Sequence, residues 1–77
     1  MILTQAQADA AYRAMVSLNN VSGIVDIRIP CGNGRYAVVK EEIMSDDIIV
    51  QLHWGGAMRD SERYYNQVAF AQAYGVE

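Results

Sequence analysis

The fold of this chain is decided by the stretch Val25-Asp26-Ile27-Arg28-Ile29-Pro30-Cys31-Gly32-Asn33-Gly34-Arg35-Tyr36-Ala37-Val38-Val39. Before Pro30, apolar and charged residues alternate with the period of two that is typical of a half-buried strand. Asn33-Gly34 is the strongest short signal for a β-hairpin, because both residues tolerate the positive φ angles of a two-residue turn. We therefore predict one strand over residues 21–30 and a second over residues 35–41.

A third strand is predicted over residues 48–54, where apolar and polar side chains again alternate. Gly55-Gly56 breaks this strand. The connections between the three strands are short, which favours an antiparallel meander, because parallel neighbours need long crossover connections.

A helix is predicted over residues 3–20. Thr4 and Gln7 have the spacing of a capping box, in which each side chain bonds the backbone N–H of the other residue. At helical spacing one apolar face of this helix is formed by Ala8, Ala11, Tyr12, Met15 and Leu18.

A second helix is predicted to begin at Asp60 or Ser61, continue to about Tyr74 and stop at Gly75. The predicted fold is therefore α+β, in the order α-β-β-β-α, with a three-stranded antiparallel sheet and two helices packed on one face. We expect residues 1–77 to form a single compact domain, because the chain shows no linker or internal repeat.

The charge balance is mildly acidic, with a formal net charge of −3. The basic residues are scattered along the chain, at Arg13, Arg28, Arg35, Lys40, Arg59 and Arg63. Because they form no basic run, we expect no direct binding to nucleic acid.

The sequence also suggests a compartment. No segment approaches the roughly 20 apolar residues of a membrane span, and the N-terminus lacks the pattern of a signal peptide. The single cysteine, Cys31, rules out an internal disulfide, so we expect a protein of the reducing cytoplasm.

Residues with catalytic chemistry are few. Cys31 and the single histidine, His53, would need to meet in a cleft, with Asp26 as an orienting group, to form a nucleophilic site. One cysteine and one histidine do not make a structural zinc site, and residues 41–47 lack the spacing of a calcium loop. We therefore expect no enzyme activity, no metal site and no cofactor.

The strongest electrostatic feature is a group of four carboxylates between the second and third predicted strands: Glu41, Glu42, Asp46 and Asp47. On an exposed turn no cleft would desolvate them, so they would make poor general acids. Two uses remain open. The turn either provides solubility and protects a sheet edge, or it contacts a basic surface in place of phosphates.

The last predicted helix carries apolar residues on two sides. Tyr64, Tyr65, Val68 and Ala71 cluster on one side, and Phe70 and Tyr74 lie on the other with Arg63 nearby. Either Phe70 and Tyr74 fold back over the loop at residues 54–56, or they form an apolar anchor for a partner, with Arg63 as part of its polar rim.

The closing run Tyr64-Tyr65-Asn66-Gln67-Val68-Ala69-Phe70-Ala71-Gln72-Ala73-Tyr74-Gly75-Val76, together with the small size, acidity and lack of catalytic motifs, resembles the small proteins of phages and mobile elements, above all the anti-CRISPR proteins. The resemblance implies a stoichiometric inhibitor in the cytoplasm of a bacterial host. Such an inhibitor binds a CRISPR surveillance complex, or other nucleic-acid-handling machinery, and blocks target DNA or subunit recruitment. Its expected contacts are the four carboxylates, then Phe70, Tyr74 and Arg63.

Two other interpretations remain open. The first is a structural module that forms a homodimer through Phe70 and Tyr74, or through an exposed edge strand. The second is a small enzyme or accessory subunit, which requires Cys31 and His53 to meet.

Overall fold

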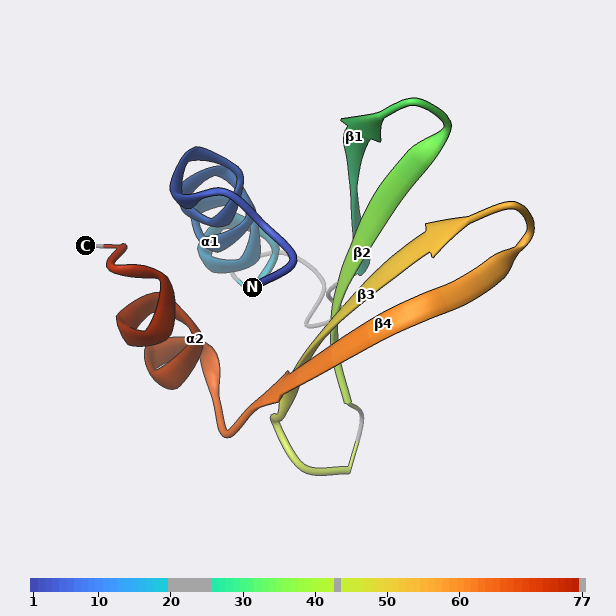
Figure 1. Ribbon diagram of the computed structural model, residues 1–77. Coiled ribbons are helices and arrows are strands. Elements are labelled where there is room, and N and C mark those ends of the chain that lie inside the picture. The colour runs from blue at the N-terminus through green and yellow to red at the C-terminus, as the bar shows by residue number, and fades with distance from the viewer. Residues whose placement is uncertain (20–25, 43, 77) are drawn as a thin grey trace.

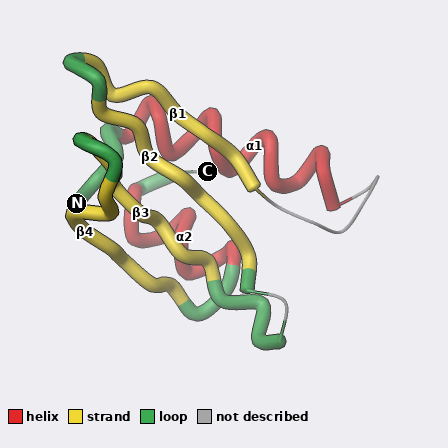
Figure 2. The backbone as a smooth tube through the Cα atoms, turned by 90° about the vertical axis from the view of Figure 1, so that its right-hand side faces the viewer, coloured by secondary structure: helices red, strands yellow, loops and turns green. Residues whose placement is uncertain are grey.

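The computed structural model of the chain describes residues 1–19, 26–42 and 44–76. Its elements in chain order are α1 (Gln5–Asn19), β1 (Asp26–Gly32), β2 (Arg35–Glu41), β3 (Ile48–Trp54), β4 (Ala57–Tyr64) and α2 (Gln67–Tyr74). The strands form one antiparallel sheet in the order β1-β2-β3-β4, and both helices lie on one face of it (Figures 1 and 2). The α+β class is therefore confirmed. The predictions for residues 20–25 and for the side chain of Leu18 lie outside the described part.

The sheet has four strands, so the prediction of three is wrong, as is the start of the second helix at Asp60 or Ser61. These two residues fit a helix N-cap, but they lie within β4, and α2 begins only at Gln67. Gly55 and Gly56, with φ angles of 62° and 77°, form the two-residue turn of a second hairpin. Because β4 is an edge strand exposed over most of its length, it needs few apolar residues and shows only a weak alternation.

The hairpin that joins β1 and β2 forms as predicted. Asn33 and Gly34 have φ angles of 56° and 77°, the left-handed values that this turn requires. A register shift between Pro30 and Gly32 makes Cys31 a bulged residue, and β1 extends past its predicted end at Pro30 to Gly32.

The helix ends are fixed by local side chains. The N–H of Thr4 donates to Gln7 Oε1 at 2.9 Å, and the N–H of Gln7 donates to Thr4 Oγ1 at 3.1 Å, so the predicted capping box is confirmed. At the start of α2, Asn66 Oδ1 accepts the N–H of Ala69 at 2.8 Å. Gly75, with a φ of 68°, ends α2 as predicted.

The core fills the space between the sheet and the two helices. Its fully buried side chains come from α1 (Ala8, Ala11, Met15), β2 (Ala37, Val39), β3 (Ile48, Val50) and α2 (Phe70). Because side chains alternate along a strand, the residues between these in β2 and β3 lie on the face that no helix covers (Figure 2).

Phe70 and Tyr74 belong to this core, with 0% and 6% of their surface exposed. Phe70 packs edge-on against Tyr64, with ring centroids 5.6 Å apart. The large apolar residues that are exposed in this part of the chain are instead Tyr65, which precedes α2, and Val68. Phe70 and Tyr74 supply packing for the fold and offer no apolar surface to a partner.

Glu62 of β4 joins three parts of the chain. Its Oε1 accepts hydrogen bonds from the hydroxyls of Tyr74 in α2, at 2.5 Å, and Tyr64, at 3.0 Å. Its Oε2 lies 3.8 Å from the N-terminal ammonium of Met1, and the Tyr74 hydroxyl in turn accepts the N–H of Leu3 at 3.3 Å. Burial, reinforced by the bond to Glu62, raises the pKa of Tyr74 well above its ordinary value of 10.0.

Replacing Tyr74 with Phe removes this hydroxyl and leaves Glu62 and the N–H of Leu3 short of a partner. We expect the free energy of unfolding to fall by about 1.5–3 kcal/mol, the range for hydrogen bonds to charged groups. Urea unfolding followed by circular dichroism measures it. Tyr65→Phe is the matched control, because Tyr65 is 80% exposed and its loss of a hydroxyl should leave stability unchanged. An equal effect of both changes would contradict the role of Glu62.

The same network predicts how stability depends on pH. The folded state holds the Tyr74 proton above the pKa of 10.0 at which the unfolded chain releases it. The stabilisation is therefore complete below about pH 10 and is lost as the pH rises further. We expect the Tm of the wild type to fall more steeply between about pH 9 and about pH 11 than that of Tyr74→Phe. Parallel slopes in a thermal unfolding series would show that Tyr74 does not contribute.

Candidate functional site

Two chemically different surfaces lie at opposite ends of the sheet. The β2–β3 connection is at one end, and the β1–β2 and β3–β4 turns are at the other (Figure 1). We call residues 41, 42 and 44–47 the acidic turn. We call the second surface the arginine–aromatic end; it comprises Arg28, Arg35, Tyr36, His53, Trp54 and Arg59.

The acidic turn is held in shape by Arg63 of β4. Its Nη1 donates to Glu42 Oε2 and to Asp47 Oδ2, each at 2.5 Å. These hydrogen bonds, to Glu42 first and then Asp47, raise the pKa of Arg63. The N–H of Glu42 donates to the backbone oxygen of Asp47 at 2.9 Å, and Asp46 takes a left-handed φ of 60° that lets the chain reverse. The turn is thus pre-organised by the ion pairs of Arg63 with Glu42 and Asp47 and by its own backbone hydrogen bond.

The tip of the acidic turn carries an exposed apolar residue. Met44 is 90% exposed, and Asp46 beside it is also exposed. Behind the tip, a hollow of about 390 Å³ is lined by Lys40, Glu41, Glu42, Met44 and Ile49. A flexible thioether next to carboxylates and an open hollow is suited to hold an apolar side chain within a charged rim.

The structure brings together five of the seven residues that the sequence named as partner contacts. Glu42, Asp46 and Asp47 lie on the turn. Glu41 leans toward α2, where it accepts a hydrogen bond from Gln67 Nε2 at 3.3 Å. Arg63 joins the carboxylates and not Phe70 and Tyr74, because those rings are in the core.

Met44 was not among the residues predicted to contact a partner. The sequence does contain a signal for it. Met44 is an apolar residue in a connection between two acidic pairs, where an apolar side chain is not expected to be buried.

The first stack of the arginine–aromatic end lies on the uncovered face of the sheet. Tyr36 of β2 pairs with His53 of β3 in the register, and their rings stack with centroids 5.1 Å apart and planes 7° apart. The guanidinium carbon of Arg28, from β1, lies 5.1 Å from the Tyr36 centroid. A guanidinium, a phenol and an imidazole thus form one row across three strands.

The second stack surrounds Trp54. Arg35, from β2, places its guanidinium carbon 4.8 Å from the Trp54 ring, and Arg59, from β4, places its own at 5.4 Å. Arg59 is the extra residue where the β3–β4 register shifts, and its Nε donates to the backbone oxygen of Trp54 at 3.1 Å. Because Trp54 directly follows His53 in the strand, the two stacks lie on opposite faces of the sheet end.

The arginine–aromatic end was not predicted from the sequence, because its three arginines are 7 and 24 residues apart along the chain. Register and a bulge bring them together, and neither can be read from a local pattern. A usable signal was present all the same. Three of the four strands, namely β2, β3 and β4, carry an arginine or an aromatic residue within three residues of a hairpin turn.

The alternative of a small enzyme requires Cys31 and His53 to meet, but the two residues lie on different faces of the sheet. Cys31 is partly buried against the core, whereas His53 stacks on Tyr36 on the uncovered face. Within the described ranges, no three His, Cys, Asp or Glu side chains are grouped to hold a metal ion. No described helix is long and apolar enough to cross a membrane.

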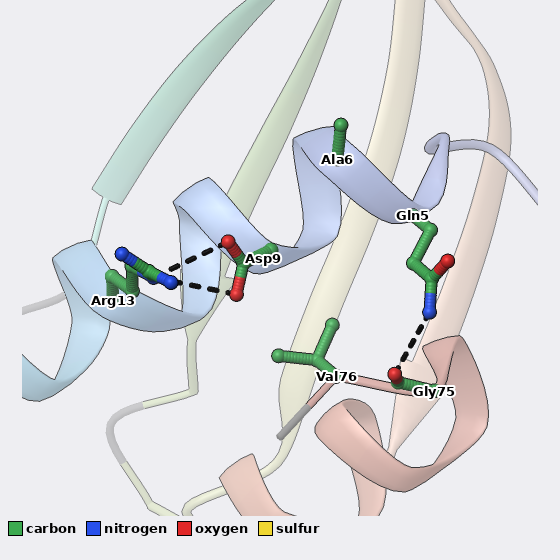
Figure 3. Close-up of a pocket in the computed structure, with 6 residues that line it drawn as sticks. All are labelled: Gln5, Ala6, Asp9, Arg13, Gly75 and Val76. Atoms are coloured by element: carbon green, nitrogen blue, oxygen red, sulfur yellow. Dashed lines mark hydrogen bonds and ion pairs between the residues drawn. The ribbon is translucent and has the colours of Figure 1, made fainter.

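A further hollow of about 620 Å³ lies between α1 and the end of α2 (Figure 3). The side chain of Gln5 crosses it and donates to the backbone oxygen of Gly75 at 2.8 Å. Asp9 and Arg13 form an ion pair at 3.2 Å along its rim. These groups satisfy one another, so the hollow is a junction between two helices.

Comparison of the chain with protein-family models, with curated proteins and with solved structures finds no match. Function is therefore inferred from the acidic turn and the arginine–aromatic end themselves.

Replacing Arg63 with Gln removes the donor shared by Glu42 and Asp47 and leaves two carboxylates facing each other. We expect the amide of Glu42, which bonds the oxygen of Asp47, to exchange its hydrogen several-fold faster. Hydrogen exchange followed by NMR measures this. Arg13→Gln removes the same charge from α1 and serves as the control. Unchanged exchange at Glu42 would mean that Arg63 does not hold the turn.

Proposed function

We propose that this protein is a non-enzymatic inhibitor that docks its acidic turn on a basic protein surface of nucleic-acid-handling machinery. The resemblance to anti-CRISPR proteins implies that the target is a CRISPR surveillance complex, which would place the protein in the cytoplasm of a bacterial host. The observation that carries the proposal is the combination of a turn held by Arg63 with an exposed Met44 at its tip.

Pre-organisation is the first support. A turn that is already ordered loses little conformational entropy when it binds, so more of the contact energy appears as affinity. Arg63 provides that order while it uses only one oxygen each of Glu42 and Asp47. The carboxylates keep acceptor capacity for lysine or arginine side chains of a partner.

Charge is the second support. One guanidinium offsets only part of the charge of four carboxylates, so the turn remains negative. Surfaces that hold nucleic acid are rich in lysine and arginine, and carboxylates on a firm turn can occupy the sites where phosphates bind. The inhibitor would then block target DNA or subunit recruitment, with a strong dependence on salt.

The structure removes one of the two surfaces through which the alternative homodimer would form. That surface relied on Phe70 and Tyr74, both of which are buried. The other surface was an edge strand. The edges are β1, which contains Pro30, and β4, which carries a bulge at Arg59; both features oppose strand-to-strand pairing.

Two single changes test the acidic turn without disturbing Arg63. Met44→Gln removes the apolar tip, and Asp46→Asn removes an exposed charge while tolerating the left-handed backbone. We expect Met44→Gln to weaken inhibition of DNA cleavage by purified CRISPR effector complexes roughly thirtyfold, the loss typical of an interface hot spot. Asp46→Asn should weaken it several-fold, more at low salt than at high salt.

Asp9→Asn is the matched control, because it removes one negative charge from α1 and should inhibit like the wild type. A variant with Glu41, Glu42, Asp46 and Asp47 all changed to Gln or Asn should be inactive. If it inhibits as well as the wild type at physiological salt, the acidic turn is not the docking surface. If the wild type inhibits none of the effector complexes, the proposed target is wrong.

A further inference from the structure

The arginine–aromatic end carries an excess of positive charge: it has three arginines, with Asp60 beside Arg59 and Asp26 two residues before Arg28 as the nearest carboxylates in sequence. Among the residues that the structure describes, Arg28, Arg35 and Arg59 form no ion pair. The nearest carboxylate in sequence, Asp60, uses Oδ1 to accept the N–H of Ser61 at 2.8 Å. In a protein of net charge −3, this end is thus a local site for an anion.

Among the described contacts of the three arginines, one N–H donor is already used, since Arg59 Nε donates to the backbone oxygen of Trp54 at 3.1 Å. Each guanidinium lies over a ring, at 5.1 Å for Arg28, 4.8 Å for Arg35 and 5.4 Å for Arg59. A cation–π contact takes up none of the N–H donors of a guanidinium in hydrogen bonds, so these donors remain free to bind another group. Such a fixed fork matches the paired oxygens of a phosphate.

The rings select among anionic partners. Surfaces for single-stranded nucleic acid combine arginines, which bind phosphates, with aromatic and guanidinium planes, on which bases stack. In the first stack Tyr36 lies between the guanidinium of Arg28 and the imidazole of His53, so the stack has a planar group at each end. Trp54 lies on the opposite face of the sheet. An acidic protein would also use the arginines and could pack side chains on the rings, whereas nucleotide bases offer a flat face to each ring or guanidinium.

Access to this end is open. The two hairpin turns between the stacks contain Gly34 and Gly56, and a Cβ atom built at either position would meet no other atom within 4 Å. A chain of nucleotides can therefore cross the turns close to the backbone and reach both stacks.

We propose that the arginine–aromatic end binds single-stranded nucleic acid, with Arg28, Arg35 and Arg59 on phosphates and the stacked planes against bases. This surface is separate from the acidic turn and lies at the opposite end of the sheet. The expectation of no nucleic-acid binding relied on the lack of a basic run, whereas the fold assembles this site from four strands.

A labelled oligodeoxythymidylate of about 12 nucleotides, within the range of known single-strand sites, provides the test. Fluorescence anisotropy measures binding, and Trp54, the single tryptophan, gives a second signal from the site itself. We expect binding that changes Trp54 emission and weakens several-fold in Arg35→Gln and in Arg59→Gln. Each change should also lower the slope of log K against log salt by about 0.7, because the variant neutralises one phosphate fewer.

Arg13→Gln is the matched control, since it removes one positive charge from α1, and it should bind like the wild type. Met44→Gln should also bind normally, which separates this proposal from the acidic turn. Thermal unfolding checks that each variant is folded. The proposal is overturned by an absence of binding at about 50 mM salt, where such contacts are strong. It is equally overturned if polyglutamate of similar length competes as well as the oligonucleotide, because the partner class would then be an acidic protein.

Discussion

The rest of the structure depends on the carboxylate of Glu62. It accepts the hydroxyls of Tyr64 and Tyr74 and lies beside the N-terminal ammonium, so one side chain links β4, α2 and the start of the chain. A domain of this size buries only about 60% of its unfolded surface and has little stability to spare. Connections between distant segments therefore matter more than they would in a larger protein.

The register of β4 that places Glu62 beside the two tyrosines also positions Arg63 for the acidic turn. Glu62 pairs with Val50, and its neighbour Arg63 pairs with Ile49 on the opposite face. A slip of β4 by one residue would exchange the two faces. Glu62 would leave the tyrosines, and Arg63 would leave Glu42 and Asp47. The same alignment thus completes the core on one side of the sheet and orders a surface turn beyond it.

The parts of the fold that the sequence predicts are those with local causes. The turn at Asn33-Gly34, the capping box of Thr4 and Gln7 and the stop at Gly75 each need only a few neighbouring residues. The sequence does not predict β4, because this edge strand is stabilised by its pairing with β3. Its charged and polar residues show no clear strand pattern. Which of the two apolar sides of α2 is buried has no local cause either, because it depends on packing against distant segments, such as the contact of Phe70 with Tyr64 of β4.

The candidate surfaces divide in the same way. The four carboxylates are neighbours in the sequence, which predicts one acidic turn. The ion pairs of Glu42 and Asp47 with Arg63, 16 residues beyond Asp47, depend on strand pairing and have no local signal. The arginine–aromatic end has no local sequence pattern, because its residues come from four different strands. The residues of such a surface become neighbours only through strand pairing, so the surface can be predicted only when the register is known.

The placement of opposite charges at the two ends of the strands gives the molecule a permanent electric dipole along the sheet. A dipole of this kind experiences a torque in the field of any highly charged assembly and rotates before contact. The protein would therefore arrive at a mixed basic and anionic target with one end already leading. Orientation during the encounter, and not the strength of any single contact, would then limit how fast the complex forms, and this advantage would fade as added salt shortens the reach of the field.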